Sequence, residues 1–226
     1  MDDLTKRDIK IISLCSVISA LLYVLFEGKI MEMGKDTTIP IITRFMPVLI
    51  IQFGMSCLGI LVVLIKNKEK LSTYGIRKRN SLKSILGCLL CSIPTVLFLY
   101  FNNELHSFLP FQGMFLTKEI LNLSIPFNVI LYMIVAIVWG LGEGLFYVVL
   151  SRKINKIKPT KGIFNLGALI CAIIAILIHG MIGFDLTTIL EAISTFILMY
   201  GSILVLEKTE NSIGNILIFF VVWNAF

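Results

Sequence analysis

The sequence WGLGEGLFYVVLSR, residues 139–152, places one carboxylate, Glu143, inside an apolar run long enough to cross a lipid bilayer. A charged side chain at membrane depth costs at least about 2.5–3.5 kcal/mol on insertion scales, so it normally faces a bundle interior or a cavity and has a polar partner. His179 also lies in an apolar run, and Asn224 adds an amide in the last apolar segment. We therefore predict that Glu143, His179 and Asn224 form one buried site.

The composition is that of an integral membrane protein. Of the 226 residues, 57% are hydrophobic and only 15% are charged, and the mean hydropathy is +0.93. No polar segment is long enough to form a second, soluble unit, so residues 1–226 are expected to be one membrane domain. The net charge of +6 lies in short loops between apolar runs, where it orients the chain, so we do not expect nucleic-acid binding.

Seven apolar runs predict an all-α, polytopic transmembrane helix bundle with about seven spans. The expected spans are residues 11–26, 45–65, 82–101, 126–150, about 163 to between 179 and 184, 186–206, and 213–226. The Phe-Glu-Gly-Lys sequence at 26–29 predicts the end of the first helix. With this division, 16 Lys and Arg residues fall on one side and 4 on the other, which places the amino terminus in the cytoplasm.

Cysteine and histidine usage predicts neither a metal nor a cofactor. All five cysteines fall inside apolar runs, where they are expected to be small packing residues. Cys88 and Cys91 have the spacing of a metal-binding pair, but no matching pair supplies the other two ligands of a structural zinc site. The second histidine, His106, falls in a predicted outer loop.

The predicted depths of the polar residues disagree. Glu143 lies about seven residues from the basic end of its span, which is roughly 10 Å into the membrane, whereas His179 lies near the opposite end of its own span. Either residues 163–167 are not yet transmembrane, or the two side chains do not meet. Trp139 and Trp223 lie inside their spans and are expected to pack or to line a cavity.

The order of these groups resembles the type II CAAX prenyl endopeptidase and bacteriocin-processing (CPBP) family of intramembrane proteases. The family's first motif reads Glu-Glu-x-x-x-Arg, and residues 142–147 match it with Gly142 at the first Glu, Glu143 at the second and Tyr147 at the Arg. The resemblance extends over about residues 70–226 and includes STYGIRKRN and LEKTENSIGNIL as similar context.

The other two family motifs are also incomplete. Phe-x-x-x-His matches residues 175–179, with His179 kept and Ala175 at the Phe. His-x-x-x-Asn matches residues 220–224, with Asn224 kept and Phe220 at the His. The resemblance thus implies a degenerate member of the family.

In the family, glutamates and histidines activate water for attack on a peptide carbonyl, and the Asn helps to hold the oxyanion. The resemblance implies catalytic-type positions at Glu143, His179 and Asn224, a cavity wall with Trp139, Tyr147 and Phe220, and no metal. With two of the four expected groups replaced, we expect a pseudoprotease that binds a hydrophobic or lipidated peptide or a membrane-protein partner.

The resemblance also implies a prokaryotic cell membrane and a role in bacteriocin immunity or envelope regulation. Two alternatives stay open at this stage. The chain is a working endopeptidase if Glu143 serves as the general base. It is a small transporter if its buried Glu and His, with Asp185 and Glu191 nearby in sequence, form a proton or substrate path.

Overall fold

The computed structural model describes residues 2–105, 107–159 and 162–226, so His106 lies outside the described residues. Helix accounts for 76% of the chain, and the described residues contain no strand. The elements are α1 Asp2–Lys35, α2 Ile41–Gln52, η1 Phe53–Leu58, α3 Gly59–Asn67, η2 Leu71–Tyr74, α4 Ser81–Phe101, α5 Thr117–Leu121, α6 Phe127–Val135, η3 Ala136–Gly142, α7 Glu143–Ile157, α8 Leu166–Ile178, α9 Leu186–Thr209, α10 Ile213–Ile218 and η4 Phe219–Trp223.

Five helices are long and apolar enough to cross a membrane, which makes the chain compatible with a multi-pass membrane protein. They run from Asp3 to Lys35, Ile41 to Asn67, Ser81 to Phe101, Phe127 to Ile157 and Leu186 to Thr209. The sixth and seventh apolar runs form shorter helices, Leu166–Ile178 and Ile213–Trp223. All seven predicted runs are therefore helical, and five of them have spanning length.

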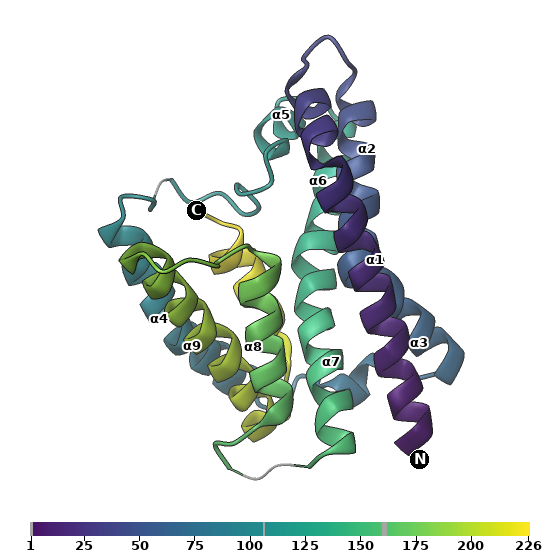
Figure 1. Cartoon of the computed structure of the whole chain (residues 1–226), viewed down its shortest axis with the longest axis vertical. Helices are drawn as coiled ribbons and strands as arrows, with labels where there is room; N and C mark the ends of the chain where they lie inside the picture. Colours follow the sequence, from purple (N-terminus) through teal and green to yellow (C-terminus); the bar gives the residue numbers. More distant parts are fainter. Residues whose placement is uncertain (1, 106, 160–161) are drawn as a thin grey trace.

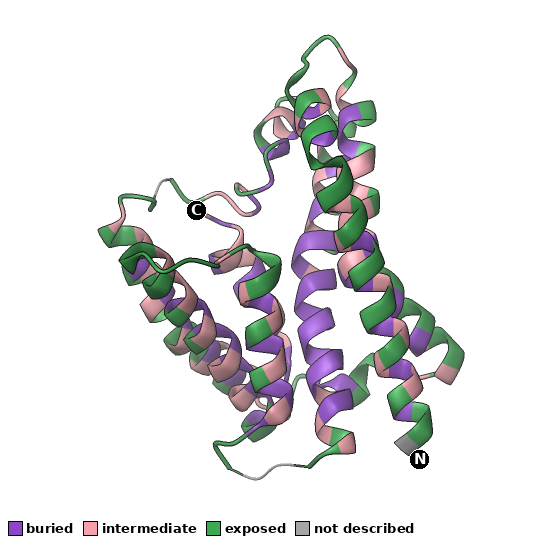
Figure 2. Ribbon diagram, viewed as in Figure 1, coloured by how far each residue is buried: buried purple, intermediate pink, exposed green. Residues whose placement is uncertain are grey.

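Helix α7 occupies the centre of the bundle. It continues directly from α6 and η3; α1, α2 and α3 lie on one side of it, and α4, α8 and α9 lie on the other (Figure 1). It contacts both α1 and α8, and nearly every residue in its first three turns is buried, as the continuous purple stretch in Figure 2 shows. Residues 143–151 of α7 therefore form an inner wall that the helices on both sides share.

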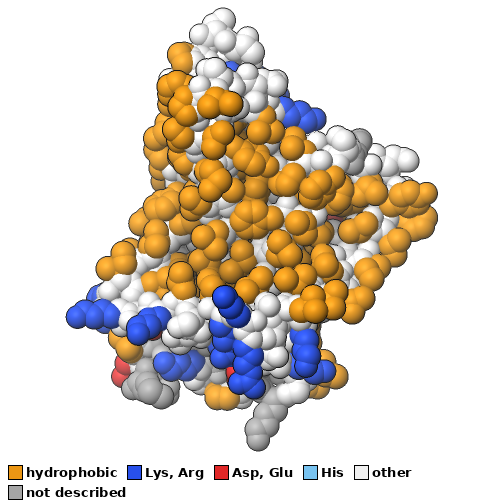
Figure 3. Space-filling model, turned by 180° about the vertical axis from the view of Figure 1, so that it is seen from behind, with side chains coloured by type: hydrophobic (Ala, Val, Ile, Leu, Met, Phe, Trp, Pro, Cys, Tyr) orange, Lys and Arg blue, Asp and Glu red, His pale blue; other side chains and the backbone are white. Residues whose placement is uncertain are grey.

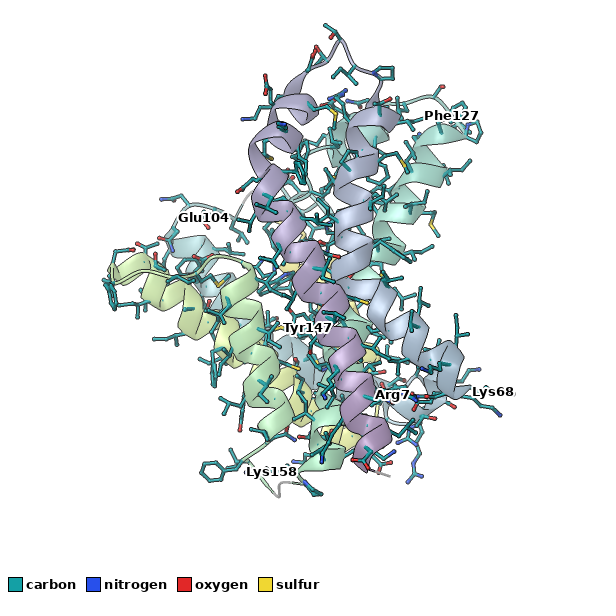
Figure 4. The ribbon with its side chains drawn as sticks, turned by 45° about the vertical axis from the view of Figure 1, so that its right-hand side comes forward. Arg7, Lys68, Glu104, Phe127, Tyr147 and Lys158 are labelled. Atoms are coloured by element: carbon teal, nitrogen blue, oxygen red, sulfur yellow. The ribbon has the colours of Figure 1, made fainter. Side chains whose placement is uncertain are left out.

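The outer faces of the peripheral helices are apolar. Side chains such as Leu25 on α1 and Leu90 on α4 are 74% and 66% exposed. Figure 3 shows a broad hydrophobic surface above a zone of Lys and Arg side chains at one end of the molecule. Figure 4 places Arg7, Lys68 and Lys158 at that end and Phe127 toward the opposite one. An apolar surface of this extent is typical of protein that faces lipid.

The first helix is longer than predicted. The expected end at residues 26–29 was wrong, because α1 continues to Lys35. A single glycine costs a helix only about 1 kcal/mol, and Gly28 is surrounded by good helix formers. The Tyr23 hydroxyl also donates to Glu27 Oε1 at 3.3 Å, one turn further on.

The boundary between the fifth and sixth runs lies where the sequence indicated. Helix α8 ends at Ile178, and Gly180 takes a positive φ of 67°, a conformation that ends many helices and favours glycine. Helix α9 then begins at Leu186, with Asp185 as its cap: the Thr188 backbone N–H donates to Asp185 Oδ1 at 2.9 Å.

Two segments that are far apart in sequence, residues 75–79 and 211–212, are hydrogen-bonded to each other. The Asn211 side-chain amide donates to the carbonyls of Arg77 and Arg79 at 2.5 and 2.9 Å. The Ser212 backbone N–H donates to the carbonyl of Gly75 at 3.0 Å. Thus STYGIRKRN and the ENSIGN turn, both singled out in the sequence, lie against each other.

A buried ionic cluster joins α1, α7 and the chain after α3. Lys153 Nζ donates to Asp8 Oδ2 at 2.8 Å and to Glu69 Oε1 at 2.7 Å. The side chains of Lys153 and Asp8 are only 5% and 1% exposed. Asn67 also donates to Asp8, and the Tyr74 hydroxyl donates to Glu69. We call these five residues the basal ionic cluster.

Candidate functional site

Glu143, His179 and Asn224 line one cavity of about 410 Å³. Glu143 is buried at the start of α7, and its Oε2 accepts a hydrogen bond of 3.3 Å from Asn224 Nδ2. His179 follows the last residue of α8, and its ring packs edge-on against Trp223, with 4.8 Å between centroids. The structure therefore brings together the acid, the imidazole and the amide that the sequence singled out.

The depth disagreement is resolved by where the helices end. Helix α7 continues to Ile157, 14 residues beyond Glu143, so it extends past the predicted end of its span at residue 150. Helix α8 begins only at Leu166, after residues 163–165. Asn155 and Asn165 are hydrogen-bonded at 3.0 Å at the basal end of the two antiparallel helices. Counting from this bond, Glu143 lies about 18 Å and His179 about 21 Å along the bundle.

Three π-helical segments converge on the site. Gln52 directly precedes η1, Glu143 directly follows η3, and Asn224 directly follows η4. Segment η3 contacts both η1 and η4. A π-helical turn contains more residues than an α-helical turn, so it changes the direction of the side chains around it, and such turns are frequent at functional sites.

Two glycines in η3 allow these segments to approach closely. A Cβ atom on Gly140 would lie 2.4 Å from the Phe220 ring, and one on Gly142 would lie 2.2 Å from Cys57 Sγ. Gly140 therefore accommodates η4, and Gly142 accommodates η1. Gly140 and Gly142 therefore serve close helix packing beside Glu143.

The aromatic residues assigned to the cavity wall have different positions. Trp139 lines the cavity and stacks on Phe45, with 6.2 Å between ring centroids. Tyr147 does not line it: it is buried against Phe219 at 5.6 Å, in the interior of the bundle where Figure 4 labels it. Phe220 does not line it either, because its ring packs against Phe111 and fills the space at Gly140.

Gln52 and the loop that covers the cavity were not predicted from the sequence. Gln52 lines the cavity together with Glu143, and its side-chain amide is a further hydrogen-bonding group there. A polar amide within the apolar run 45–65 was the available signal. The loop reaches the site because the Gly113 N–H donates to the Asn224 carbonyl at 3.4 Å. Residues Gly113, Met114 and Phe115 all line the cavity, and nothing in their sequence marks them.

The remaining acids lie elsewhere. Asp185 caps α9, and neither Asp185 nor Glu191 lines the cavity. Within the described ranges, no three His, Cys, Asp or Glu side chains are grouped so that they could hold a metal ion. The Glu143 carboxylate and the His179 imidazole are therefore the groups available for proton transfer. Tyr23 and the amides of Gln52 and Asn224 add hydrogen-bonding groups to a wall that is otherwise mainly apolar.

Fold and site together define a class: an all-helical protein with membrane-length apolar helices and, between them, a mainly apolar cavity that contains a few polar groups. In comparisons with family models, with curated proteins and with solved structures, no match was found.

Proposed function

We propose that the chain is a multi-pass protein of a prokaryotic cell membrane, with seven crossings and a cytoplasmic amino terminus. The apolar outer surface and the Lys and Arg residues at one end support this arrangement. The two short helices need non-helical chain to complete their crossings. Such chain is tolerated at membrane depth where it lines a cavity, as His179 and Asn224 do.

We further propose that it is a CPBP-like pseudoprotease. Glu143, His179 and Asn224 come from the three segments that resemble the family's motifs, and they meet in one cavity. The positions where the motifs are broken lie outside that cavity: Gly142 faces Cys57, and Phe220 packs on Gly140.

One observation carries the preference for binding over cleavage: the Asn224 amide donates to Glu143 itself. An oxyanion donor must be aimed at the position of the developing negative charge, about 2.7–3.1 Å away. The donor and the base are thus bonded to each other.

The occupant is a hydrophobic or lipidated peptide segment. A cavity of about 410 Å³ is in the range that holds ligands, and its lining combines apolar side chains with a few polar groups. Met31, Val48, Ile51 and Met55 offer an apolar surface, and methionine adapts its shape to different partners. The amides and Glu143 supply hydrogen-bonding groups for a peptide backbone.

The test uses purified protein in lipid nanodiscs with two fluorescent peptides, one hydrophobic and one farnesylated, and measures anisotropy and product masses together. Met55→Trp fills the cavity and is expected to weaken binding at least about tenfold, or about 1.4 kcal/mol. Leu25→Trp, on the outer face of α1, is the matched control and should bind as the parent does. Glu143→Gln should still bind, and no variant should release product. Equal affinity of the parent and Met55→Trp would contradict this site.

The second candidate is an active endopeptidase, favoured by the presence of a carboxylate and an imidazole in one cavity. Here Glu143 would take a proton from water and His179 would orient that water. Product formation by the parent, lost in Glu143→Gln with peptide binding retained, would establish this candidate and overturn the pseudoprotease.

A further inference from the structure

A second polar cavity, of about 370 Å³, lies between the start of α4 and the end of α9. Its lining residues are Asn80, Lys83, Gly87, Val205, Lys208 and Thr209. The two helices are antiparallel neighbours (Figure 1), and none of the residues that line this cavity lines the cavity at Glu143. We call it the α4–α9 cavity.

The α4–α9 cavity is positively charged. Among the described residues, neither Lys83 nor Lys208 is within ion-pair distance of a carboxylate. The acids near Lys208 have other partners: Glu210 pairs with Arg77 at 2.5 Å, and Glu207 accepts from Asn155 at 3.5 Å. Two ammonium groups therefore remain available to an anion.

The first turn of α4 adds its dipole and its backbone N–H groups other than that of Ser81, which donates to the Lys78 carbonyl at 3.2 Å. Asn80 precedes this 21-residue helix, but its side chain does not cap it. The Asn80 amide donates to the Thr209 carbonyl at 3.0 Å instead and joins the two helices. An uncapped helix amino terminus favours negative charge through its free N–H groups and its dipole.

The floor of the α4–α9 cavity is apolar. A Cβ atom on Gly87 would lie 2.9 Å from both Val205 methyl groups, so the helices are in close contact there. Leu82 and Leu86, on the adjoining face of α4, are 66% and 53% exposed. The cavity thus has a cationic mouth and an apolar base that continues into the outer apolar surface.

From this arrangement we infer that the α4–α9 cavity binds an anionic phospholipid. The phosphodiester lies between Lys83, Lys208 and the first turn of α4, and an acyl chain follows Gly87 and Leu86 toward the bilayer. Basic pockets between membrane helices recognise acidic headgroups in this way. The inference rests on the proposed membrane location and is independent of peptide binding at Glu143.

Native mass spectrometry of the detergent-purified full chain measures lipid binding at the α4–α9 cavity, with phosphatidylglycerol as the probe. We expect one tight adduct and no comparable adduct with phosphatidylcholine. Lys83→Gln with Lys208→Gln should weaken phosphatidylglycerol binding about 30-fold, or about 2 kcal/mol. Lys66→Gln with Lys70→Gln removes the same charge from the same end and should bind as the parent does.

Two further probes separate the lipid from its headgroup. Inorganic phosphate and glycerophosphoglycerol, which lack acyl chains, should not compete at millimolar concentration. Equal loss of phosphatidylglycerol binding in both double variants, or no loss in Lys83→Gln with Lys208→Gln, would overturn the site. Effective competition by inorganic phosphate would overturn the lipid as its occupant.

Discussion

Gly142 shows how one residue can have opposite meanings in the sequence and in the structure. The family resemblance places it where a catalytic glutamate is expected, but its α-carbon faces Cys57 and Ser56 in η1. There is no room for a carboxylate there, because even a Cβ atom would lie 2.2 Å from Cys57 Sγ. The acid that reaches the cavity is its neighbour, Glu143.

Gly142→Ala should therefore destabilise the protein by about 1–3 kcal/mol, the usual cost of overpacking. The added methyl group collides with the Cys57 sulfur, so Cys57→Ala should restore much of the loss in the double variant. Thermal unfolding in detergent of both single variants and the double variant measures this coupling. Additive losses would show that the two residues do not share this contact.

At the scale of elements, the basal ionic cluster fixes α1 and the chain after α3 against α7. Helix α1 packs against α2, η1, α3 and α7, but only 11% of its most apolar window is buried inside the protein. Lys153 supplies the one positive charge shared by Asp8 and Glu69 within the described cluster. Removing one partner of a buried ion pair costs more than the pair contributes, because a buried charge is left uncompensated.

Lys153→Met should lower the free energy of unfolding by about 3–5 kcal/mol. Lys156, three residues further on and exposed, is the control, and Lys156→Met should change the unfolding free energy by less than about 0.5 kcal/mol. The measurement is chemical unfolding in mixed micelles. Equal stability of the two variants would show that the ion pairs do not hold α1 in place.

The same cluster predicts a dependence of stability on pH. Burial alone would raise the pKa of Glu69, but hydrogen bonds from Lys153 and Tyr74 lower this pKa below its ordinary value of 4.5. A lowered pKa in the folded state gives a stabilisation that is present above the unfolded pKa and is lost as the pH falls through the folded one. The melting temperature should therefore fall on acidification below pH 4.5.

Glu69→Gln should have a lower melting temperature at pH 7 and a shallower decline below pH 4.5 than the parent. Melting temperatures of the parent and Glu69→Gln are compared at a series of pH values. Glu32→Gln, on α1 and outside the cluster, is the control. Parallel pH profiles for the parent and Glu69→Gln would exclude Glu69 as a source of the acid sensitivity.

At the scale of the whole molecule, the helices were the predictable part. Apolar runs separated by basic loops are enough to locate all seven helical segments, because burial in lipid or protein requires internal hydrogen bonds. The ends of α1 and α7 were not predictable, since Glu27 continues α1 with a hydrogen bond within the helix and Lys153 continues α7 with tertiary ion pairs. Composition cannot show those contacts.

The site was predictable only in its ionisable groups. Glu143 and His179 stand out because charge and imidazole are rare in apolar runs, whereas Gln52 is neutral and the 113–115 loop reaches the cavity through the folded chain. The directions of Tyr147 and Phe220 depend on π-helical turns, which have no simple sequence signal. The motif pattern therefore placed Tyr147 and Phe220 on the cavity wall, whereas the π-helical turns direct both side chains elsewhere.

The proposed topology gives a further expected outcome. In cells treated with a membrane-impermeant maleimide, a cysteine at Thr38 should be labelled from outside. Cysteines at Lys70 and Lys158 should be labelled only after permeabilisation. The parent chain is the control, because its five cysteines lie within helices and are buried or half-buried. Labelling of Thr38→Cys and Lys70→Cys from the same side would contradict the topology.

The π-helical turn before Glu143 has a consequence for how this site can change over generations. Each residue added to a continuous helix rotates the downstream part of that helix by about 100° relative to the upstream part. A deletion of one codon within residues 136–142 would therefore turn either the aromatic wall at Trp139 or the acid at Glu143 away from its present neighbours. Insertion or deletion of a single codon can therefore remove or create this site as directly as a substitution of Glu143 can.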